Sequence, residues 1–184
     1  GFGVDQRTSV SDEKVDSLSR FVGFEKIELV DNRVKKEDDR TQLDFNAIAK
    51  GYAADVIGLF LDSEGIETYM VEIGGDLITK GKKPDGTHWR IGLEIPAKSM
   101  EAEQEWHYFV ELYNQGLATS GDYRRFIEED GQRYSHTINP QTGFPVKHNL
   151  MSASVFAHDA MSADAYATAF MVMGLDEAIA FVEA

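Results

Sequence analysis

Apolar and polar positions repeat with two different periods along the chain, and each period predicts one kind of element. The segment ETYMVEI alternates Tyr69, Val71 and Ile73 with other residues, which is the two-residue period of a strand. The segment from about 47 to 63 repeats every three to four residues and predicts a helix. Further helices are predicted at about 11–23, 162–173 and 176–183, and further strands or hairpins at 24–36, 76–81, 88–95, 106–113, 123–138 and 151–158. So many antiparallel strands with a few helices predict an α+β fold, and a length of 184 residues fits one domain or two small intertwined halves.

The helix at about 47–63 has two unlike sides. At about 100° per residue, one side is an apolar stripe that predicts a core-facing surface: Ile48, Ala49, Tyr52, Val56, Leu59 and Phe60. The other side holds Asp44, Ala47, Lys50, Gly51 and Gly58. A glycine inside a helix costs roughly 1 kcal/mol against alanine, so two glycines on one side indicate that something packs closely there. Taken alone, the helix leaves open whether Lys50 contacts a ligand or is simply a solvated charge.

Charge and composition narrow the function classes. The 32 acidic and 18 basic residues give a net charge of −14, which argues against sequence-independent nucleic-acid binding. Any polyanionic ligand must therefore be met locally, by a metal, a lysine or helix N-termini. The sequence contains no cysteine, so disulfides, zinc thiolate sites and thiol nucleophiles are excluded. No apolar run is long enough for a transmembrane helix.

The segment HDAMSADAYATAFMV contains a candidate metal site. Asp164 and Thr168 are four residues apart, so they would lie about 40° from each other on a helix. The alanines around them leave the surface low. A carboxylate and a hydroxyl suit a hard cation such as Mg²⁺, which can keep open positions for phosphate oxygens. The alternative is an alanine-rich packing helix whose Asp164 and Thr168 cap the helix or face water.

Three loops are candidates for contacts with an oxyanion, because glycines at strand ends let backbone amides approach one. Glu72, Gly74, Gly75 and Asp76 lie in the first loop, Thr119, Ser120, Gly121 and Asp122 in the second, and His136 in the third. Each loop alone is more often just a turn, and a single histidine such as His136 is more often structural than catalytic.

Five segments, taken in order, resemble the signature blocks of the ApbE family, the FAD:protein FMN transferases. These segments are LDFNAIAKGYAADVI, VEIGGDLITKG…PDGTHWRIGLEIP, LATSGDYRRF, DGQRYSHTINPQTGFPV and SVFAHDAMSADAYATAFMVMG. The resemblance extends over residues 1 to 184 and covers the C-terminal part of a typical member. It implies a T-fold-like α+β domain from which the N-terminal part of the family domain, with its share of the flavin site, is absent.

The resemblance also implies a reaction and its cofactors. FAD would be cleaved at its pyrophosphate with the help of Mg²⁺, FMN would pass to a threonine or serine hydroxyl of a partner protein, and AMP would leave. Two alternatives stay open, which are a Mg²⁺-dependent FAD pyrophosphatase giving FMN and AMP, and a non-catalytic flavin-binding protein. Measurement of AMP release and of covalent flavin on an acceptor separates the three.

Site roles follow from the same resemblance. Asp164, Thr168 and the carbonyl of Ala47 match the metal ligands. Asp44 and Lys50 match contacts to the flavin nucleotide, and Gly51 would leave room for the dinucleotide beside the metal-bearing carbonyl. His136 matches the histidine near the flavin and would act as the base. The loop residues assigned to FAD binding are Glu72, Gly74, Gly75, Asp76, Ser120 and Gly121.

Partners and location are implied by the family alone. Its acceptors are subunits of membrane redox complexes, such as the sodium-pumping NADH:quinone reductase (Nqr) and Rnf systems. Many members are exported lipoproteins, which implies a location in the periplasm or on the outer face of the cytoplasmic membrane. The chain begins Gly1-Phe2-Gly3 and shows no signal sequence of its own.

Overall fold

The computed structural model describes residues 11–94, 106–121, 126–129, 132–135, 137–146 and 150–184. The chain divides into two compact units. Unit 1 consists of Gly1–Asp44 and Arg125–Lys147, and unit 2 of Phe45–Arg124 and His148–Ala184. That the two units form a single domain over 1–184 stays a prediction.

Unit 1 contains short helical segments and two hairpins. The elements are α1 (Asp12–Ser19), the 3-10 turn η1 (Phe24–Lys26), the hairpin β1 (Ile27–Val30) and β2 (Arg33–Lys36), and the hairpin β8 (Phe126–Glu129) and β9 (Gln132–Ser135). The first hairpin turns at Asp31 and Asn32, whose φ angles of 50° and 57° are those of a two-residue hairpin turn. Both hairpins confirm the sequence prediction, although the predicted turn at Asp130 and Gly131 lies outside the described residues.

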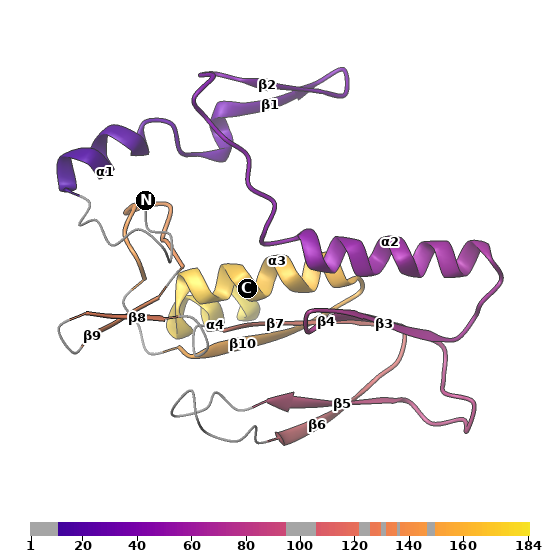
Figure 1. Cartoon of the computed structure of the whole chain (residues 1–184). Helices are drawn as coiled ribbons and strands as arrows, with labels where there is room; N and C mark the ends of the chain where they lie inside the picture. Colours follow the sequence, from indigo (N-terminus) through magenta and orange to yellow (C-terminus); the bar gives the residue numbers. More distant parts are fainter. Residues whose placement is uncertain (1–10, 95–105, 122–125, 130–131, 136, 147–149) are drawn as a thin grey trace. The chain divides into compact units, whose positions relative to one another are not determined.

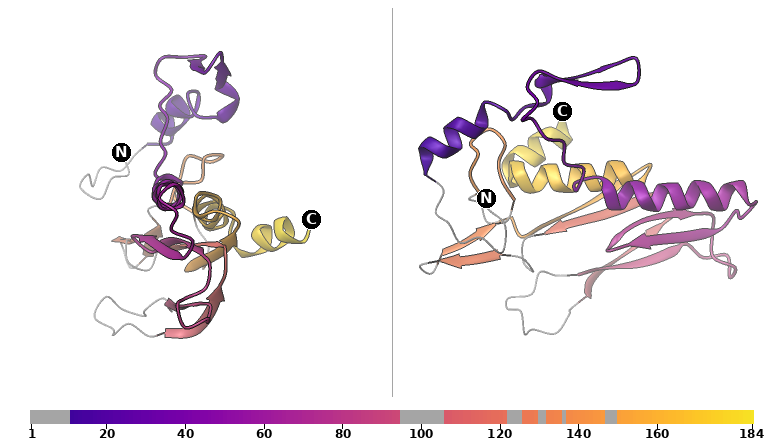
Figure 2. Two further views of the ribbon diagram at one scale, coloured as in Figure 1. Left: turned by 90° about the vertical axis from the view of Figure 1, so that its right-hand side faces the viewer. Right: turned by 45° about the horizontal axis from the view of Figure 1, so that its top comes forward.

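Unit 2 is built on a four-stranded antiparallel sheet with the strand order β10-β7-β4-β3. Helices α2 and α3 lie side by side over one face of this sheet, and the hairpin of β5 and β6 lies on the other face (Figure 1; Figure 2, left). The strands are β3 (Tyr69–Ile73), β4 (Asp76–Lys80), β5 (Trp89–Glu94), β6 (Trp106–Leu112), β7 (Gly116–Gly121) and β10 (Ser152–Ala157). The helices are α2 (Ala49–Ser63), α3 (Ala160–Met173) and α4 (Leu175–Glu183).

The two faces of the sheet bury side chains of different size. Towards the hairpin, Leu77, Leu112 and Leu117 form a buried cluster against the partly buried β5 and β6 side chains. Towards α3, the buried cluster consists of Ala118, Ala163 and Ala167. Because alanine side chains are short, α3 can approach the sheet closely on this second face. Small residues thus set the position of the helix that carries the predicted metal ligands.

Strand β7 was not predicted, because its last three residues, Thr119, Ser120 and Gly121, were interpreted as part of a loop. It is a central strand that pairs with both β10 and β4. Two glycines and a run of small residues give it neither apolar alternation nor high strand propensity. A Cβ atom on Gly116 would lie 2.4 Å from the main-chain carbon of Asp159, so close approach of the segment before α3 explains this glycine.

The predicted core-facing stripe of α2 was wrong. Tyr52, Leu59 and Phe60 are 57%, 67% and 60% exposed, whereas α2 buries Gly51, Ala54 and Gly58. The helix packs through its smallest residues because α3 and the sheet come close to its backbone on that side. The close packing that the two glycines indicate is confirmed. Among the described residues, no helix combines the length and the apolar character that crossing a bilayer requires.

Candidate functional site

The first turns of α2 and α3 meet at Gly51. A Cβ atom built on Gly51 would lie 2.2 Å from the carbonyl oxygen of Ala160 and 2.8 Å from the Cα atom of Met161. These atoms belong to the backbone of α3, so a larger residue at 51 could not be accommodated by a rotamer change. The sequence resemblance assigned this space to a dinucleotide, but the structure fills it with α3. Whether Gly51 also contacts FAD stays a prediction.

Asp164 joins the two helices from the α3 side. Its side chain is 3% exposed, and its Oδ2 atom accepts a hydrogen bond of 3.1 Å from the backbone N–H of Gly51. Gly51 is the third residue of α2, so its N–H is one of the helix-start amides that have no intrahelical carbonyl partner, and the Asp164 carboxylate supplies that partner. The first backbone bond of α2 runs from the Tyr52 N–H to the carbonyl of its N-cap, Ile48. The Ala47 carbonyl precedes the N-cap, and within the described residues it receives no hydrogen bond from Gly51.

Thr168 lies one turn after Asp164 on the same side of α3. Its Oγ1 atom is 3.1 Å from the Oγ atom of Ser120 on β7, so a hydrogen bond fixes the hydroxyl of this threonine. Asp164 is thus held by α2 and Thr168 by β7. The carbonyl of Ala47, the Asp164 carboxylate and the Thr168 hydroxyl provide an all-oxygen donor set, which fits a hard cation such as Mg²⁺.

Lys50 and Asp76 form the second part of the site. The Nζ atom of Lys50 lies 2.5 Å from Oδ2 of Asp76, whose side chain is 1% exposed. Its other oxygen, Oδ1, has no hydrogen-bond partner within the described residues. Burial raises the pKa of the Asp76 carboxyl, the Lys50 ammonium opposes this shift, and the nearby Asp164 carboxylate adds to it. Two buried carboxylates with one ammonium leave an excess of negative charge, which favours a cation.

The predicted glycine loop joins β3 to β4 beside Lys50. Gly74 and Gly75 have φ angles of 57° and 95°, which glycine adopts readily. The Oε1 atom of Glu72 accepts a 2.7 Å hydrogen bond from the N–H of Gly75, so the exposed Glu72 closes the turn. A Cβ atom on Gly74 would lie 3.4 Å from Cδ of Lys50. The structure therefore brings this loop to the Lys50 side chain, while a contact of Glu72 with FAD stays a prediction.

The remaining predicted residues are only partly placed. Ser120 lies at the site through Thr168, and Gly121 follows it at the end of β7, opposite Ser152 of β10. Asp44 belongs to unit 1 and is not placed against the α2–α3 junction. His136 and Asp122 lie outside the described residues. Their predicted roles are untested.

Sequence reasoning missed Asp55. Its two carboxylate oxygens accept hydrogen bonds of 2.9 Å and 2.8 Å from the N–H groups of Ala160 and Met161, the first residues of α3. Asp55 lies four residues after Gly51, on the same side of α2. Its position on the same side of the helix as Gly51, where close packing was predicted, was a usable sequence signal for a contact with another element.

Two further features of the described residues limit the alternatives for the site. Within the described part of the chain, no three His, Asp or Glu side chains converge on a possible metal position. A metal site made of the Ala47 carbonyl, the Asp164 carboxylate and the Thr168 hydroxyl contains only one carboxylate, so it is not a cluster of that kind.

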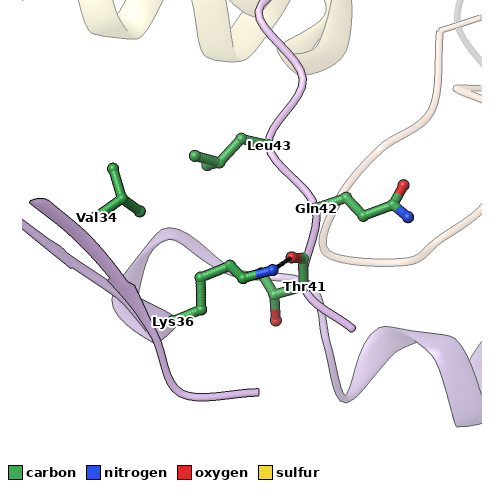
Figure 3. Close-up of a pocket in the computed structure, with 5 residues that line it drawn as sticks. All are labelled: Val34, Lys36, Thr41, Gln42 and Leu43. Atoms are coloured by element: carbon green, nitrogen blue, oxygen red, sulfur yellow. Dashed lines mark hydrogen bonds between the residues drawn. The ribbon is translucent and has the colours of Figure 1, made fainter. Parts of the chain in front are cut away.

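A hollow of about 460 Å³ lies in unit 1, lined by Val34, Lys36, Thr41, Gln42 and Leu43 (Figure 3). None of the predicted site residues lines it, and the Lys36 ammonium is already bonded to the Thr41 carbonyl.

Comparison with known proteins gives the family. The model of the ApbE family matches residues 1–184. A FAD:protein FMN transferase of Vibrio cholerae serotype O1 is 40% identical over 186 residues, covering 100% of this chain and 55% of that protein. One of Haemophilus influenzae is 37% identical over 189 residues, with 100% and 54% covered. The crystal structure of the flavinyl transferase ApbE of Pseudomonas stutzeri, in its apo form, matches with a TM-score of 0.85 at 39% identity, covering 100% of this chain and 56% of that one.

These matches confirm the α+β fold and the resemblance found in the sequence motifs. The chain spans about half the length of the curated relatives that it matches. A family model that covers every residue, together with relatives and a solved structure of the same family, shows that this chain belongs to the ApbE family.

Proposed function

We propose that this chain carries the catalytic metal and pyrophosphate site of a Mg²⁺-dependent FAD:protein FMN transferase. The observation that carries the proposal is the hydrogen bond from the Gly51 N–H to Asp164. This bond brings the Asp164 carboxylate to the first turn of α2, where the Ala47 carbonyl precedes the N-cap and is not used by the first backbone bond of the helix. The names of the relatives, FAD:protein FMN transferase, supply the reaction.

Ala47, Asp164 and Thr168 would hold the metal through a carbonyl, a carboxylate and a hydroxyl oxygen. A bound Mg²⁺ would neutralise pyrophosphate charge and polarise the phosphorus–oxygen bonds. Phosphoryl transfer depends mostly on positioning and on such neutralisation, so the protein needs few reacting groups. Oxygens held just before α2 and on α3 would meet that need.

Lys50 would bind a pyrophosphate oxygen, and Asp76 would orient it. The lysine side chain is 44% exposed at its ion pair with the buried Asp76, so the ammonium is accessible while its position is fixed. The ammonium also offsets part of the negative charge of the two carboxylates, which would otherwise repel a polyanion. Lys50 and Asp76 thus act together on the substrate.

His136 would take the proton from the incoming threonine or serine hydroxyl of the acceptor. The hydroxyl oxygen would then form a bond to the phosphorus of the FMN half of FAD, and the bond to the AMP half would break. AMP would leave with the bridging oxygen. If water took the place of the acceptor hydroxyl, the products would be FMN and AMP.

The test is incubation of the protein with FAD, Mg²⁺ and a threonine-containing acceptor protein. Mass spectrometry would follow the acceptor, and chromatography would follow AMP. One FMN on the acceptor for each AMP released supports the transferase. AMP without modified acceptor indicates a pyrophosphatase, and neither product indicates a flavin-binding protein without this activity.

The physiological acceptors and the location are further proposals. By family, the acceptors would be subunits of Nqr- or Rnf-type redox complexes, and the protein would act in the periplasm or on the outer face of the cytoplasmic membrane as a lipoprotein. The names of the relatives support a protein acceptor in general. Labelling of membrane fractions with and without the gene would identify the modified subunit.

A further inference from the structure

The N-terminal turn of α3 is bonded to two different aspartates. Asp159 precedes the helix, and its Oδ1 atom accepts a 2.6 Å hydrogen bond from the N–H of Ser162, as an ordinary N-cap does. Asp55 lies on α2 and accepts hydrogen bonds from the N–H groups of Ala160 and Met161. The first cap is local to α3, whereas the second ties α3 to another helix.

Carboxylates of both helices take part in the hydrogen bonds between α2 and α3. Asp55 of α2 binds the first amides of α3, and Asp164 of α3 binds the Gly51 amide in the first turn of α2. The two helices run antiparallel with their first turns side by side (Figure 1). One first-turn amide of α2 and two of α3 are therefore bonded to a carboxylate of the other helix, where the helix dipole also favours negative charge.

The steric contact between α2 and α3 fixes their relative position less tightly than these hydrogen bonds do. The backbone of α3 touches α2 at Gly51, where there is no side chain to interlock with it. Contact between a glycine and a backbone limits approach but permits sliding along the helix axis. Two charge-assisted hydrogen bonds that one carboxylate accepts from adjacent amides have a defined geometry and oppose such sliding.

We propose that Asp55 is a positioning residue for the metal site. It holds α3 in the register at which Asp164 and Thr168 face the carbonyl of Ala47. This inference rests on the proposed function, since it concerns the metal ligands. Asp55 itself binds neither the metal nor the substrate.

The experiment compares Asp55→Asn with Asp159→Asn. Both variants remove one charge at the N-terminus of α3, but only the first alters the bonds between α2 and α3. Isothermal titration with MgCl₂, well below the Tm of each variant, gives the Kd for Mg²⁺. We expect Asp55→Asn to raise this Kd at least tenfold and Asp159→Asn to change it by less than twofold, although both lower the Tm.

The outcomes separate the two proposals. If wild type binds Mg²⁺ and Asp55→Asn binds it with an unchanged Kd, Asp55 is only structural and the inference is wrong. Equal weakening in Asp159→Asn would also overturn it, because the effect would then belong to the helix terminus in general. A wild-type protein that binds no Mg²⁺ would overturn the metal site itself.

A second variant and a second measurement keep the proposal testable if Asp55→Asn does not fold. If Asp55→Asn does not fold, Asp55→Ser retains a short oxygen that cannot span the gap to α3, and the same rise in Kd is expected. An unchanged Kd in this variant would overturn the inference. In either variant, amide hydrogen exchange of Gly51 should accelerate without metal present, since its bond to Asp164 depends on the register of α3.

Discussion

Replacement of Gly51 by alanine tests the contact on which the site depends. The added Cβ atom would lie 2.2 Å from the Ala160 carbonyl oxygen and 2.6 Å from the carbon of the same carbonyl. Ordinary contacts between such atoms are about 3.5 Å, so α3 must move away by about 1 Å. The obstructing atoms are backbone, and no side chain can rotate to make room.

Two opposing effects set the size of the change. Alanine is favoured over glycine inside a helix by about 1 kcal/mol. Overpacking of a well-packed contact costs about 1–3 kcal/mol, and the upper end applies because the clash is with backbone. We therefore expect a net loss of about 2 kcal/mol in unfolding free energy, with a fall in Tm of roughly 4–8 °C for a protein of this size.

Gly58→Ala is the matched control. Gly58 lies two turns later on the same buried side of α2, and a Cβ atom there would meet the Tyr69 hydroxyl at 3.0 Å. A tyrosine side chain can shift by a few tenths of an ångström, so the gain in helix propensity should roughly cancel the cost. We expect its unfolding free energy to stay within about 1 kcal/mol of wild type.

The assay combines urea unfolding with Mg²⁺ titration of both variants. A shift of α3 by about 1 Å would separate Asp164 and Thr168 from Ala47, and misplacement on this scale can cost about a hundredfold in rate. Gly51→Ala should therefore lose both stability and Mg²⁺ affinity, and Gly58→Ala should keep both. If Gly51→Ala were as stable and as tight in Mg²⁺ binding as Gly58→Ala, the close contact of α2 with α3 would be refuted.

Four other changes have defined outcomes. Lys50→Ala should mainly raise the Kd for FAD, and an unchanged Kd in a binding titration would exclude its pyrophosphate role. Ser120→Ala frees the Thr168 hydroxyl and should weaken Mg²⁺ binding by a few fold in calorimetry, less than loss of a ligand would. Burial raises the pKa of the Asp76 carboxyl, so its contribution to the free energy of unfolding is present at low pH and falls as the pH rises through that pKa. Asp76→Asn should remove this pH dependence in a series of urea-unfolding measurements in EDTA. His136→Ala should lower kcat more than it raises KM, and full turnover across neutral pH would reject His136 as the base.

Hydrophobic periodicity predicted most of the elements, because most of them alternate or repeat clearly. Strand β3 and helix α3 begin within two residues of their expected places, and hairpin β1–β2 begins three residues after its expected start. Strand β7 was lost because α3 packs so closely on it that only small residues fit, and small residues carry no periodic signal. The same cause misled the reading of α2, whose buried side is made of Gly51, Ala54 and Gly58.

The candidate site was predicted in part. Asp164 and Thr168 were singled out from their spacing and assigned as metal ligands by the family resemblance; the structure gives each a hydrogen-bond partner, and their role as ligands stays a prediction. Asp55 was not found, because an aspartate on a helix usually faces water and its partners are 105 and 106 residues away. Contacts between backbone amides and distant carboxylates depend on tertiary packing, and the sequence offered only the position of Asp55 on the same side of α2 as Gly51.

Anomalous diffraction from crystals grown with Mn²⁺ in place of Mg²⁺ would test the metal site most directly. Mn²⁺ accepts the same oxygen ligands and gives a strong anomalous signal at a known position. We predict a peak at the α2–α3 junction, coordinated by the Asp164 carboxylate, the Thr168 hydroxyl and the Ala47 carbonyl. A peak elsewhere, or none at this junction while the protein binds Mn²⁺ in solution, would contradict the assignment.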